Sequence, residues 1–299
     1  MRAINYYQLG ATLYIPMTHV DAVDIIHRVK LPNLRSIVLC LEDSVSEEDV
    51  PLAMERLENE ILVDYKITDL KVFIRPRNLE NLKSILKMGG ITNIDGFALP
   101  KFDTTNISQY LSLFIEKNSF YIMPILETKD VFSGVQLLRI LSELEPFREK
   151  ILCVRVGSED IMSLLNTMRT CEKTIYEILP FYIILSTILN LFKSNNFNVS
   201  SPVYGCYKNV GILEKELKGD IEHSIFNKTT IHPSQIDTIH DAYSVTEDEF
   251  YVASKLLNSD MSVFGHNGRM FEKKTHSNWA KSIIEREKYY GKKEENAGK

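Results

Sequence analysis

The feature that most constrains the fold is the recurrence of short, continuously apolar segments between residues 11 and 231. Continuous apolarity, as opposed to strict alternation, is typical of strands that are buried on both faces of a parallel sheet. The segments therefore predict parallel strands. The expected strands are Ala11–Pro16, Ser36–Leu41, Lys71–Arg75, Gly96–Pro100, Phe120–Ile125, Ile151–Gly157, Asn198–Val203 and Asn227–Ile231.

The stretches between these strands have the spacing of amphipathic helices. In Asp49–Leu62, for example, Leu52, Leu57 and Ile61 fall on one side. The other expected helices are Leu79–Lys87, Val131–Leu144 and an additional buried helix near Lys173–Lys193. Regular alternation of strands and helices predicts βαβ units. Eight such units within roughly 250 residues favour a closed α/β structure, the TIM (β/α)8 barrel, over an open sheet.

The pattern changes after Ile239. Helices are expected at Asp248–Leu257 and Ser277–Tyr289, with a Gly- and Asn-containing loop, residues 262–276, between them. We therefore expect residues 1–242 to form the barrel domain. Residues 243–299 are expected to form a C-terminal helical extension that packs on the barrel or on a neighbouring subunit.

Composition excludes several classes of partner. The net charge of −5 leaves no broad basic field for nucleic acid. The most apolar stretch, Ile178–Phe192, contains Pro180 and is short for a bilayer span, so no membrane partner is expected. The first ten residues lack the apolar region of a signal peptide. These observations predict a cytoplasmic protein.

The four cysteines do not form a metal-binding motif. No two of them are spaced as CxxC, so a zinc site is not expected. Cys40, Cys153, Cys171 and Cys206 are interpreted as reduced cysteines in a cytosolic protein, the first two inside strands.

Charged side chains follow five consecutive predicted strands. Strand two ends in Glu42 and Asp43, and strand three ends in Arg75. Lys101 follows strand four, Glu127 follows strand five, and Asp160 follows strand six. Because the chemistry of TIM barrels gathers at the C-terminal ends of the strands, we expect these six residues to meet at one face.

Carboxylates and cations at one barrel mouth suggest a metal site. Mg²⁺ prefers oxygen ligands and commonly takes one or two carboxylates. Glu127 and Asp160 are the predicted metal ligands, and Glu42 and Asp43 could hold metal-bound waters. Arg75 could bind a substrate carboxylate with two hydrogen bonds, while the metal stabilises an enolate.

Each of these residues also has a structural interpretation. Asp43 and Asp160 could be N-caps of the helices that follow them. Lys101 could simply pair with a neighbouring carboxylate. The pattern across five strand ends favours the functional interpretation of the set.

Seven segments in order resemble the HpcH/HpaI aldolase and citrate lyase β-subunit family, part of the phosphoenolpyruvate/pyruvate superfamily of barrels. The similarity covers residues 11–242. The segments are Leu13–Met17, Val38–Val45, Phe73–Asn78, Ala98–Phe102, Met123–Thr128, Val156–Ile161 and Thr229–Ile236. The chain resembles most a divergent branch, the C–C bond lyases of the TIM-barrel fold. That similarity rests on Gly10–Pro16, on Pro202–Tyr204 and on a C-terminal pattern from Arg269 to Ala280.

The resemblance implies a carbon–carbon lyase or aldolase that acts on a small carboxylate through a metal-stabilised enolate. It implies Mg²⁺, with Mn²⁺ as an alternative, at Glu127 and Asp160. Arg75 is implied as the residue that binds substrate, with Glu42, Asp43 and Lys101 as further catalytic residues. No organic cofactor site is carried over. Related barrels are typically homo-oligomers, so a trimer or a hexamer is expected.

Two alternatives stay open at this point. The first is a lyase or synthase that acts on a coenzyme A thioester. Departures from such relatives at Gly10 and at Asn227–Lys228 disfavour it. The second is a barrel without catalysis that serves as a binding or assembly subunit.

His19 and His232 are both interpreted as structural residues, His232 as a helix cap.

Overall fold

The computed structural model describes residues 3–63, 68–116 and 119–293. The chain forms two compact units, Met1–Ile236 and Asp237–Lys299. None of the helices in the described part of the chain combines the length and the apolarity that a bilayer span requires.

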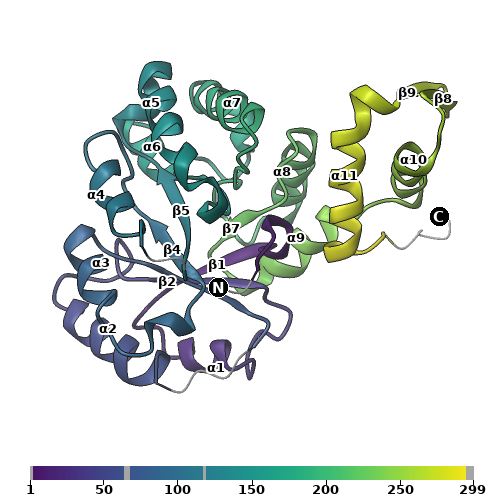
Figure 1. The fold of residues 1–299 in the computed structure, drawn as a ribbon. Helices are drawn as coiled ribbons and strands as arrows, with labels where there is room; N and C mark the ends of the chain where they lie inside the picture. The colour runs from purple at the N-terminus through teal and green to yellow at the C-terminus, as the bar shows by residue number, and fades with distance from the viewer. Residues whose placement is uncertain (1–2, 64–67, 117–118, 294–299) are drawn as a thin grey trace. The chain divides into compact units, whose positions relative to one another are not determined.

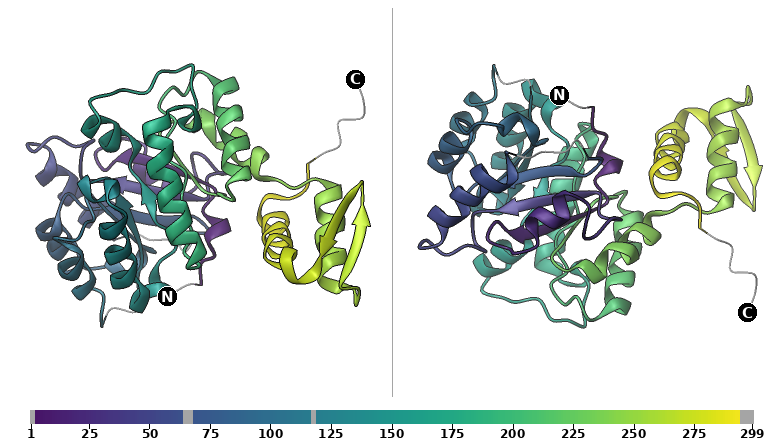
Figure 2. Two further views of the ribbon diagram at one scale, coloured as in Figure 1. Left: turned by 90° about the horizontal axis from the view of Figure 1, so that it is seen from above. Right: turned by 90° about the horizontal axis from the view of Figure 1, so that it is seen from below.

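The first unit is built on a parallel sheet whose strands are surrounded by helices (Figures 1 and 2). The strand order is β6-β5-β4-β3-β2-β1-β7. The strands are β1 (Ala11–Pro16), β2 (Ser36–Cys40), β3 (Lys71–Arg75), β4 (Gly96–Leu99), β5 (Tyr121–Leu126), β6 (Arg155–Val156) and β7 (Lys228–Thr230). All residues of β2 and β5 are buried. Their continuous apolarity therefore reflects two covered faces.

A short segment around residue 200 closes the sheet between β6 and β7. The Val154 amide donates to the Asn198 carbonyl at 2.8 Å, and the Ser201 amide donates to the Asn227 carbonyl at 2.8 Å. Single parallel bridges join Val154 to Val199 and Ser201 to Lys228. The predicted seventh strand is therefore present as this short connection. The unit is the predicted TIM barrel.

The helices of the first unit follow the strands in the predicted alternation. They are α1 (Ala22–Ile26), α2 (Val50–Arg56), α3 (Leu79–Ile85), α4 (Ile107–Ser112), α5 (Gly134–Leu144), α6 (Ser158–Leu164), α7 (Leu179–Ser194) and α8 (Val210–Glu222). The additional buried helix predicted near Lys173–Lys193 is α7. Its apolar side packs inward, with Phe181, Leu185 and Phe192 buried.

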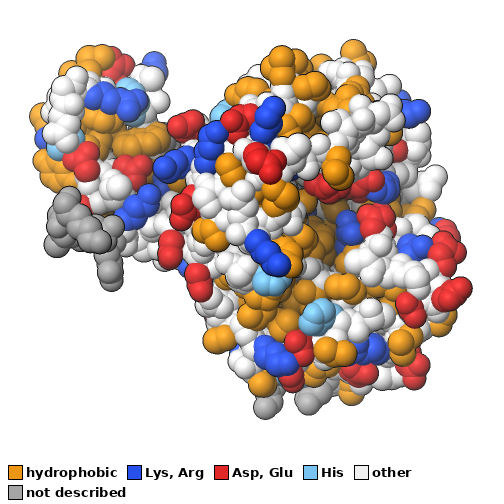
Figure 3. Space-filling view, turned by 180° about the vertical axis from the view of Figure 1, so that it is seen from behind, with side chains coloured by type: hydrophobic (Ala, Val, Ile, Leu, Met, Phe, Trp, Pro, Cys, Tyr) orange, Lys and Arg blue, Asp and Glu red, His pale blue; other side chains and the backbone are white. Residues whose placement is uncertain are grey.

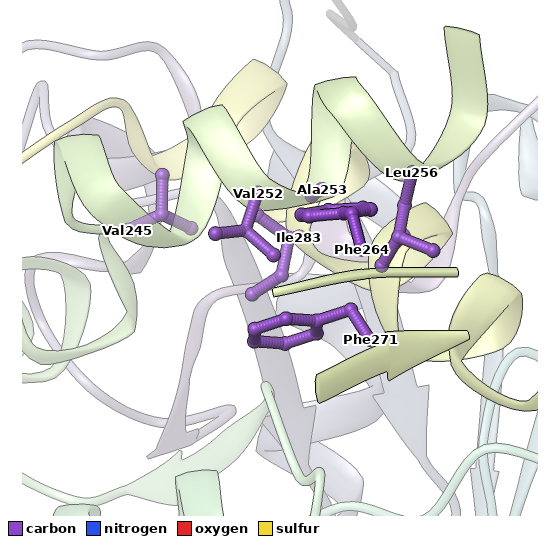
Figure 4. Close-up of a cluster of buried hydrophobic side chains, with 8 residues drawn as sticks. Val245, Val252, Ala253, Leu256, Phe264, Phe271 and Ile283 are labelled. Atoms are coloured by element: carbon purple, nitrogen blue, oxygen red, sulfur yellow. The ribbon is translucent and has the colours of Figure 1, made fainter. Parts of the chain in front are cut away.

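The second unit contains α9 (Ile236–Tyr243), which begins at the unit boundary, then α10 (Glu247–Asn258) and α11 (Lys273–Tyr290). A hairpin of β8 (Val263–His266) and β9 (Arg269–Glu272) lies between α10 and α11 in sequence. This unit has its own apolar core. Figure 4 shows Val252, Leu256, Phe264, Phe271 and Ile283 directed toward one another from these elements.

The prediction of a loop over residues 262–276 is wrong. Asn267 and Gly268 both have positive φ, 46° and 74°. Two consecutive residues of this kind match the type I′ turn of a two-residue hairpin, for which Asn-Gly is the preferred sequence. The remaining residues, Lys273 to His276, form the first turn of α11.

The interpretation of all four cysteines as reduced is also wrong. Cys40 and Cys153 are free and buried, as expected. Cys171 and Cys206 instead form a disulfide, with their Cα atoms 5.6 Å apart. The two residues are separated by 35 positions, and the barrel brings their loops together.

Candidate active site

A cavity of about 460 Å³ is lined by residues at the C-terminal ends of the barrel strands. Asp43, Arg75, Glu127 and Asp160 all contribute to its wall, and Arg155 does so from β6. On the larger unit, Figure 3 shows a hollow with apolar walls around which acidic and basic side chains gather. The barrel therefore brings together residues that are far apart in sequence.

Glu127 follows β5 and is the most buried carboxylate of this group, with 3% exposure. Its Oε1 accepts a hydrogen bond from the Lys101 amide at 2.8 Å. Burial raises the pKa of Glu127 to about 8, although the Lys101 charge acts in the opposite direction. An acidic group held in this way gains from a nearby cation.

Gly157 makes room for the Glu127 side chain. A Cβ atom at position 157 would lie 2.2 Å from Glu127 Oε2 and 2.6 Å from its Cβ. Real side chains do not approach so closely, so any other residue would displace the carboxylate. The glycine that follows β6 therefore makes room for the glutamate that follows β5.

Asp160 lies in the first turn of α6, whose N-cap residue is Gly157. The interpretation of Asp160 as the N-cap is therefore wrong. Its Oδ1 lies 2.5 Å from Lys101 Nζ. Asp43 does not cap a helix either, since α2 begins at Val50 after its N-cap Asp49.

Lys101 places one positive charge among three carboxylates. Besides Asp160, its Nζ lies 3.7 Å from Glu42 Oε1 and 3.7 Å from Glu127 Oε1. Burial acts to lower the pKa of Lys101, but Glu127, Asp160 and Glu42 outweigh it and raise the pKa. The Lys101 backbone has a left-handed conformation, with φ at 49°. A non-glycine residue in this region is uncommon.

Arg75, at the end of β3, is held by groups on β2 and β1. Its Nη1 lies 3.0 Å from Glu42 Oε2, and its Nη2 lies 3.6 Å from Asp43 Oδ2. It also donates to Cys40 Sγ at 3.2 and 3.1 Å. The guanidinium lies 5.5 Å from the centre of the Tyr14 ring. These contacts orient a cation at the cavity wall.

The donors present fit a divalent cation of the magnesium type. Among the described residues, no three His, Cys, Asp or Glu side chains are arranged to share one ion. Mg²⁺ does not need three, because it is commonly held by one or two carboxylates and keeps several waters. The Lys101 ammonium marks a position between Glu127 and Asp160 where positive charge is stabilised. The two residues are therefore suitable ligands.

Arg155 is a cavity residue that sequence reasoning missed. It lies in β6 with 2% exposure. Its Nη2 donates to Thr229 Oγ1 at 2.8 Å, and its Nη1 donates to Asn227 Oδ1 at 3.3 Å. The one available signal was an arginine inside an otherwise apolar strand.

His19 and His232 have the structural roles that were expected of them. His232 Nδ1 accepts a hydrogen bond from the Ser234 amide at 3.2 Å and caps the turn that follows β7. His19 Nδ1 accepts from the Asp21 amide at 3.1 Å, just before α1.

Sequence comparison matches residues 3–292 to the family described as C–C bond lyase of the TIM-barrel fold. Among proteins with curated descriptions, none matches the sequence.

Solved structures with the same fold cover most of the chain. CitE from Mycobacterium tuberculosis, in complex with magnesium, acetoacetate and coenzyme A, is 18% identical with a TM-score of 0.70, covering 96% of this chain and 99% of that chain. RipC from Yersinia pestis is 18% identical with a TM-score of 0.63, covering 82% and 99%. The M. tuberculosis citrate lyase β subunit complexed with oxaloacetate and magnesium is 19% identical with a TM-score of 0.60, covering 80% and 99%.

Proposed function

The chain belongs to the family of C–C bond lyases of the TIM-barrel fold, and from this premise we propose the reaction that it catalyses. It cleaves, or in reverse forms, a carbon–carbon bond in a small carboxylate such as a 2-oxo acid. Mg²⁺, with Mn²⁺ as an alternative, binds to Glu127 and Asp160. The observation that carries the proposal is the meeting of these two carboxylates with Arg75 at one cavity.

Arg75 is proposed to bind the substrate carboxylate. A guanidinium matches a carboxylate with two parallel hydrogen bonds, and Arg75 is already fixed by Glu42 on one side. Glu42 is buried, so its contact with Arg75 is shielded from water. Glu42 therefore acts as a positioning residue for Arg75.

A magnesium ion, when bound, would polarise a carbonyl oxygen of the substrate. The acetoacetate, oxaloacetate and pyruvate complexes of the M. tuberculosis proteins, all with magnesium, support this combination of metal and small carboxylate. Glu127 and Asp160 supply the negative charge for the cation. Lys101 holds Asp160 in place and balances the charge of the acidic group.

Asp43 is proposed to accept the proton in the cleavage direction. It lines the cavity, and its side chain is 58% exposed. The hydroxyl proton of an aldol substrate passes to Asp43, the carbonyl of the first product forms, and the carbon–carbon bond breaks. The electron pair of that bond stays on the 2-oxo acid fragment as an enolate, which then takes a proton from water. Asp43 returns its proton to solvent.

The coenzyme A alternative is not favoured by the residues that would recognise the ligand. Lys228 is fully buried, and its Nζ lies 2.8 Å from Glu216 and 3.4 Å from Asp220. Asn227 donates to the Thr12 hydroxyl inside the barrel. Neither side chain is available to a phosphate at the surface.

A non-catalytic barrel would have no need for the acidic and basic group described above.

Two wider proposals are made, the first from the composition of the chain and the second from the family resemblance. They are that the protein works in the cytoplasm and that it forms a homotrimer or a homohexamer. The Cys171–Cys206 disulfide argues against a reducing compartment, where such bonds are rare. Titration of free thiols in protein taken directly from cells tests the first proposal. Sedimentation of the purified protein tests the second.

The central assay measures release of a 2-oxo acid from a panel of 4-hydroxy-2-oxo acids, with and without chelator. We expect activity that requires Mg²⁺ or Mn²⁺. Arg75→Met should raise KM, and Glu127→Gln should abolish turnover. Lys83→Met is a matched control, because Lys83 pairs with Glu80 on an exposed face. Undiminished turnover in thorough chelator would contradict the proposal.

A further inference from the structure

Arg155 is a buried cation without a carboxylate partner among the described residues. Its hydrogen-bond acceptors are the Asn227 amide oxygen, the Thr229 hydroxyl and, at 3.5 Å, the Met123 sulfur. Its Nε, fully shielded, has no acceptor. Burial of an unpaired charge is costly, so such a group points to a missing anion.

Neighbouring groups that can ionise do not supply the missing charge. Burial raises the pKa of the Cys153 thiol to about 11, with Arg155 acting in the opposite direction. Burial also raises the pKa of Tyr14, whose ring centre lies 5.2 Å from the Arg155 guanidinium. Both groups are therefore neutral near pH 7.

Other buried cations of the first unit are matched to carboxylates. Lys228 lies between Glu216 and Asp220, and Arg169 pairs with Glu216. These pairs follow the usual rule that a buried charge is compensated. Arg155 departs from that rule, and it is the one of the three that lines the cavity.

The position of Arg155 relates it to the proposed substrate-binding residue. Arg75 and Arg155 both lie near the Tyr14 ring, at 5.5 and 5.2 Å from its centre. Both line the same cavity of about 460 Å³. Thr229 also lines it, and because its oxygen accepts from Arg155, its hydroxyl hydrogen is free to donate to a ligand.

We propose that Arg155, with Thr229, binds a second carboxylate of the substrate, so that the enzyme acts on small dicarboxylates. Arg75 binds the carboxylate next to the reacting carbonyl, and Arg155 binds the distal one. Arg155 Nη2 gives one of its two hydrogens to Thr229, which leaves the other as a donor that suits a carboxylate. This inference rests on the proposed function, because it takes Arg75 as the first anchor.

The test compares ligands that differ by one carboxylate. The probes are 2-oxoglutarate and 2-oxopentanoate, which share chain length, with oxaloacetate and 2-oxobutyrate as a shorter pair. Dissociation constants are measured by calorimetry in the presence of Mg²⁺. The wild-type protein should bind each dicarboxylate tighter by about tenfold or more, as expected for a charge-assisted hydrogen bond. Equal affinities within both pairs would overturn the inference without any variant.

Variants assign the preference to Arg155. Arg155→Met should remove this preference by weakening dicarboxylate binding. Arg155→Lys keeps the charge if the Met variant does not fold, and it should reduce the preference without abolishing it. An undiminished preference in either variant that folds would contradict the role of Arg155. Arg75→Met tests the proposed function separately from the role of Arg155. Loss of monocarboxylate binding in this variant would support the proposed function even if the Arg155 variants fail to change the preference.

Discussion

At the scale of single residues, the site depends on the missing side chain of Gly157 as much as on the carboxylate of Glu127. Glu127 is buried close to the Gly157 backbone, and no side chain fits between them. Lys101 then supplies positive charge from the neighbouring strand end. Small changes at these positions should therefore alter cation binding more than folding.

Gly157→Ala should weaken binding of Mn²⁺ by about tenfold or more, because residues that orient metal ligands typically have effects of this size. The added Cβ would displace the Glu127 carboxylate. Gly134→Ala is the matched control, since nothing lies within 4 Å of a Cβ there. Equal Mn²⁺ affinity in both variants, measured by electron paramagnetic resonance, would show that Glu127 is not a ligand.

Lys101→Met should tighten binding of the cation while lowering turnover. The ammonium competes with a divalent ion for Asp160 and Glu127, and its removal leaves these two carboxylates without a positive partner. Like charges at short distance favour uptake of a cation. Calorimetric titration with Mg²⁺ checks this. An affinity unchanged from wild type would mean that the ammonium and the ion do not share a position.

The candidate site could be predicted at its strand ends and not in its interior. Glu42, Asp43, Arg75, Lys101, Glu127 and Asp160 each follow an apolar run, so the barrel topology alone brings them to one face. Arg155 lies inside such a run. Its partners Asn227 and Thr229 are more than 70 positions away. Local patterns do not reveal contacts of that kind.

At the scale of elements, the barrel strands were predictable because strands that are buried on both faces have continuously apolar sequences. The β8–β9 hairpin was not predicted, since its strands are short and largely exposed, with Phe264 and Phe271 as their buried residues. Its decisive signal was the Asn267–Gly268 pair. The disulfide escaped prediction because only the folded loops bring Cys171 to Cys206.

The end of α7 gives a pH-dependent prediction. Burial lowers the pKa of Lys193 to about 8, from 10.5. Between these two values the unfolded chain binds more protons at this residue than the folded chain, so its contribution to stability rises with pH. Below about pH 8 the ammonium of this partly buried side chain lowers the stability of the folded chain. The Lys193 amine donates to the Ser224 carbonyl, a bond that the neutral form keeps.

Lys193→Met should therefore be more stable than wild type at pH 7, and this advantage should disappear as the pH approaches 10.5. Melting temperatures of both proteins at several pH values check the trend, and Lys83→Met serves as an exposed control. An advantage of the Met variant that does not change with pH would show that packing, not ionisation, is responsible.

At the scale of the whole molecule, the chain has two compact units, each with its own apolar core. The division into a catalytic domain, residues 1–242, and an extension, residues 243–299, stays a prediction. The proposed metal ligands all belong to the first unit. A cation that binds the folded form alone stabilises the unit that contains its site.

Calorimetry should therefore show two unfolding transitions. Mg²⁺ should raise the midpoint temperature of the barrel transition and leave that of the second unit unchanged. Gly268→Val identifies the latter, because φ of 74° is strained for a β-branched residue. This variant should lower the transition of the second unit and leave the effect of Mg²⁺ intact. A single unfolding transition whose midpoint temperature rises with Mg²⁺ would contradict the prediction that the two units unfold independently.

The proposed function depends above all on the claim that Glu127 and Asp160 hold a divalent cation. Titration of the purified protein with Mn²⁺, followed by electron paramagnetic resonance, tests it most directly. Glu159→Gln is the matched control, because Glu159 lines the same cavity beside Asp160. We predict one Mn²⁺ per chain in wild type and in Glu159→Gln, and loss of binding in Glu127→Gln and Asp160→Asn. Undiminished binding in the last two variants, or none in wild type, would contradict the claim.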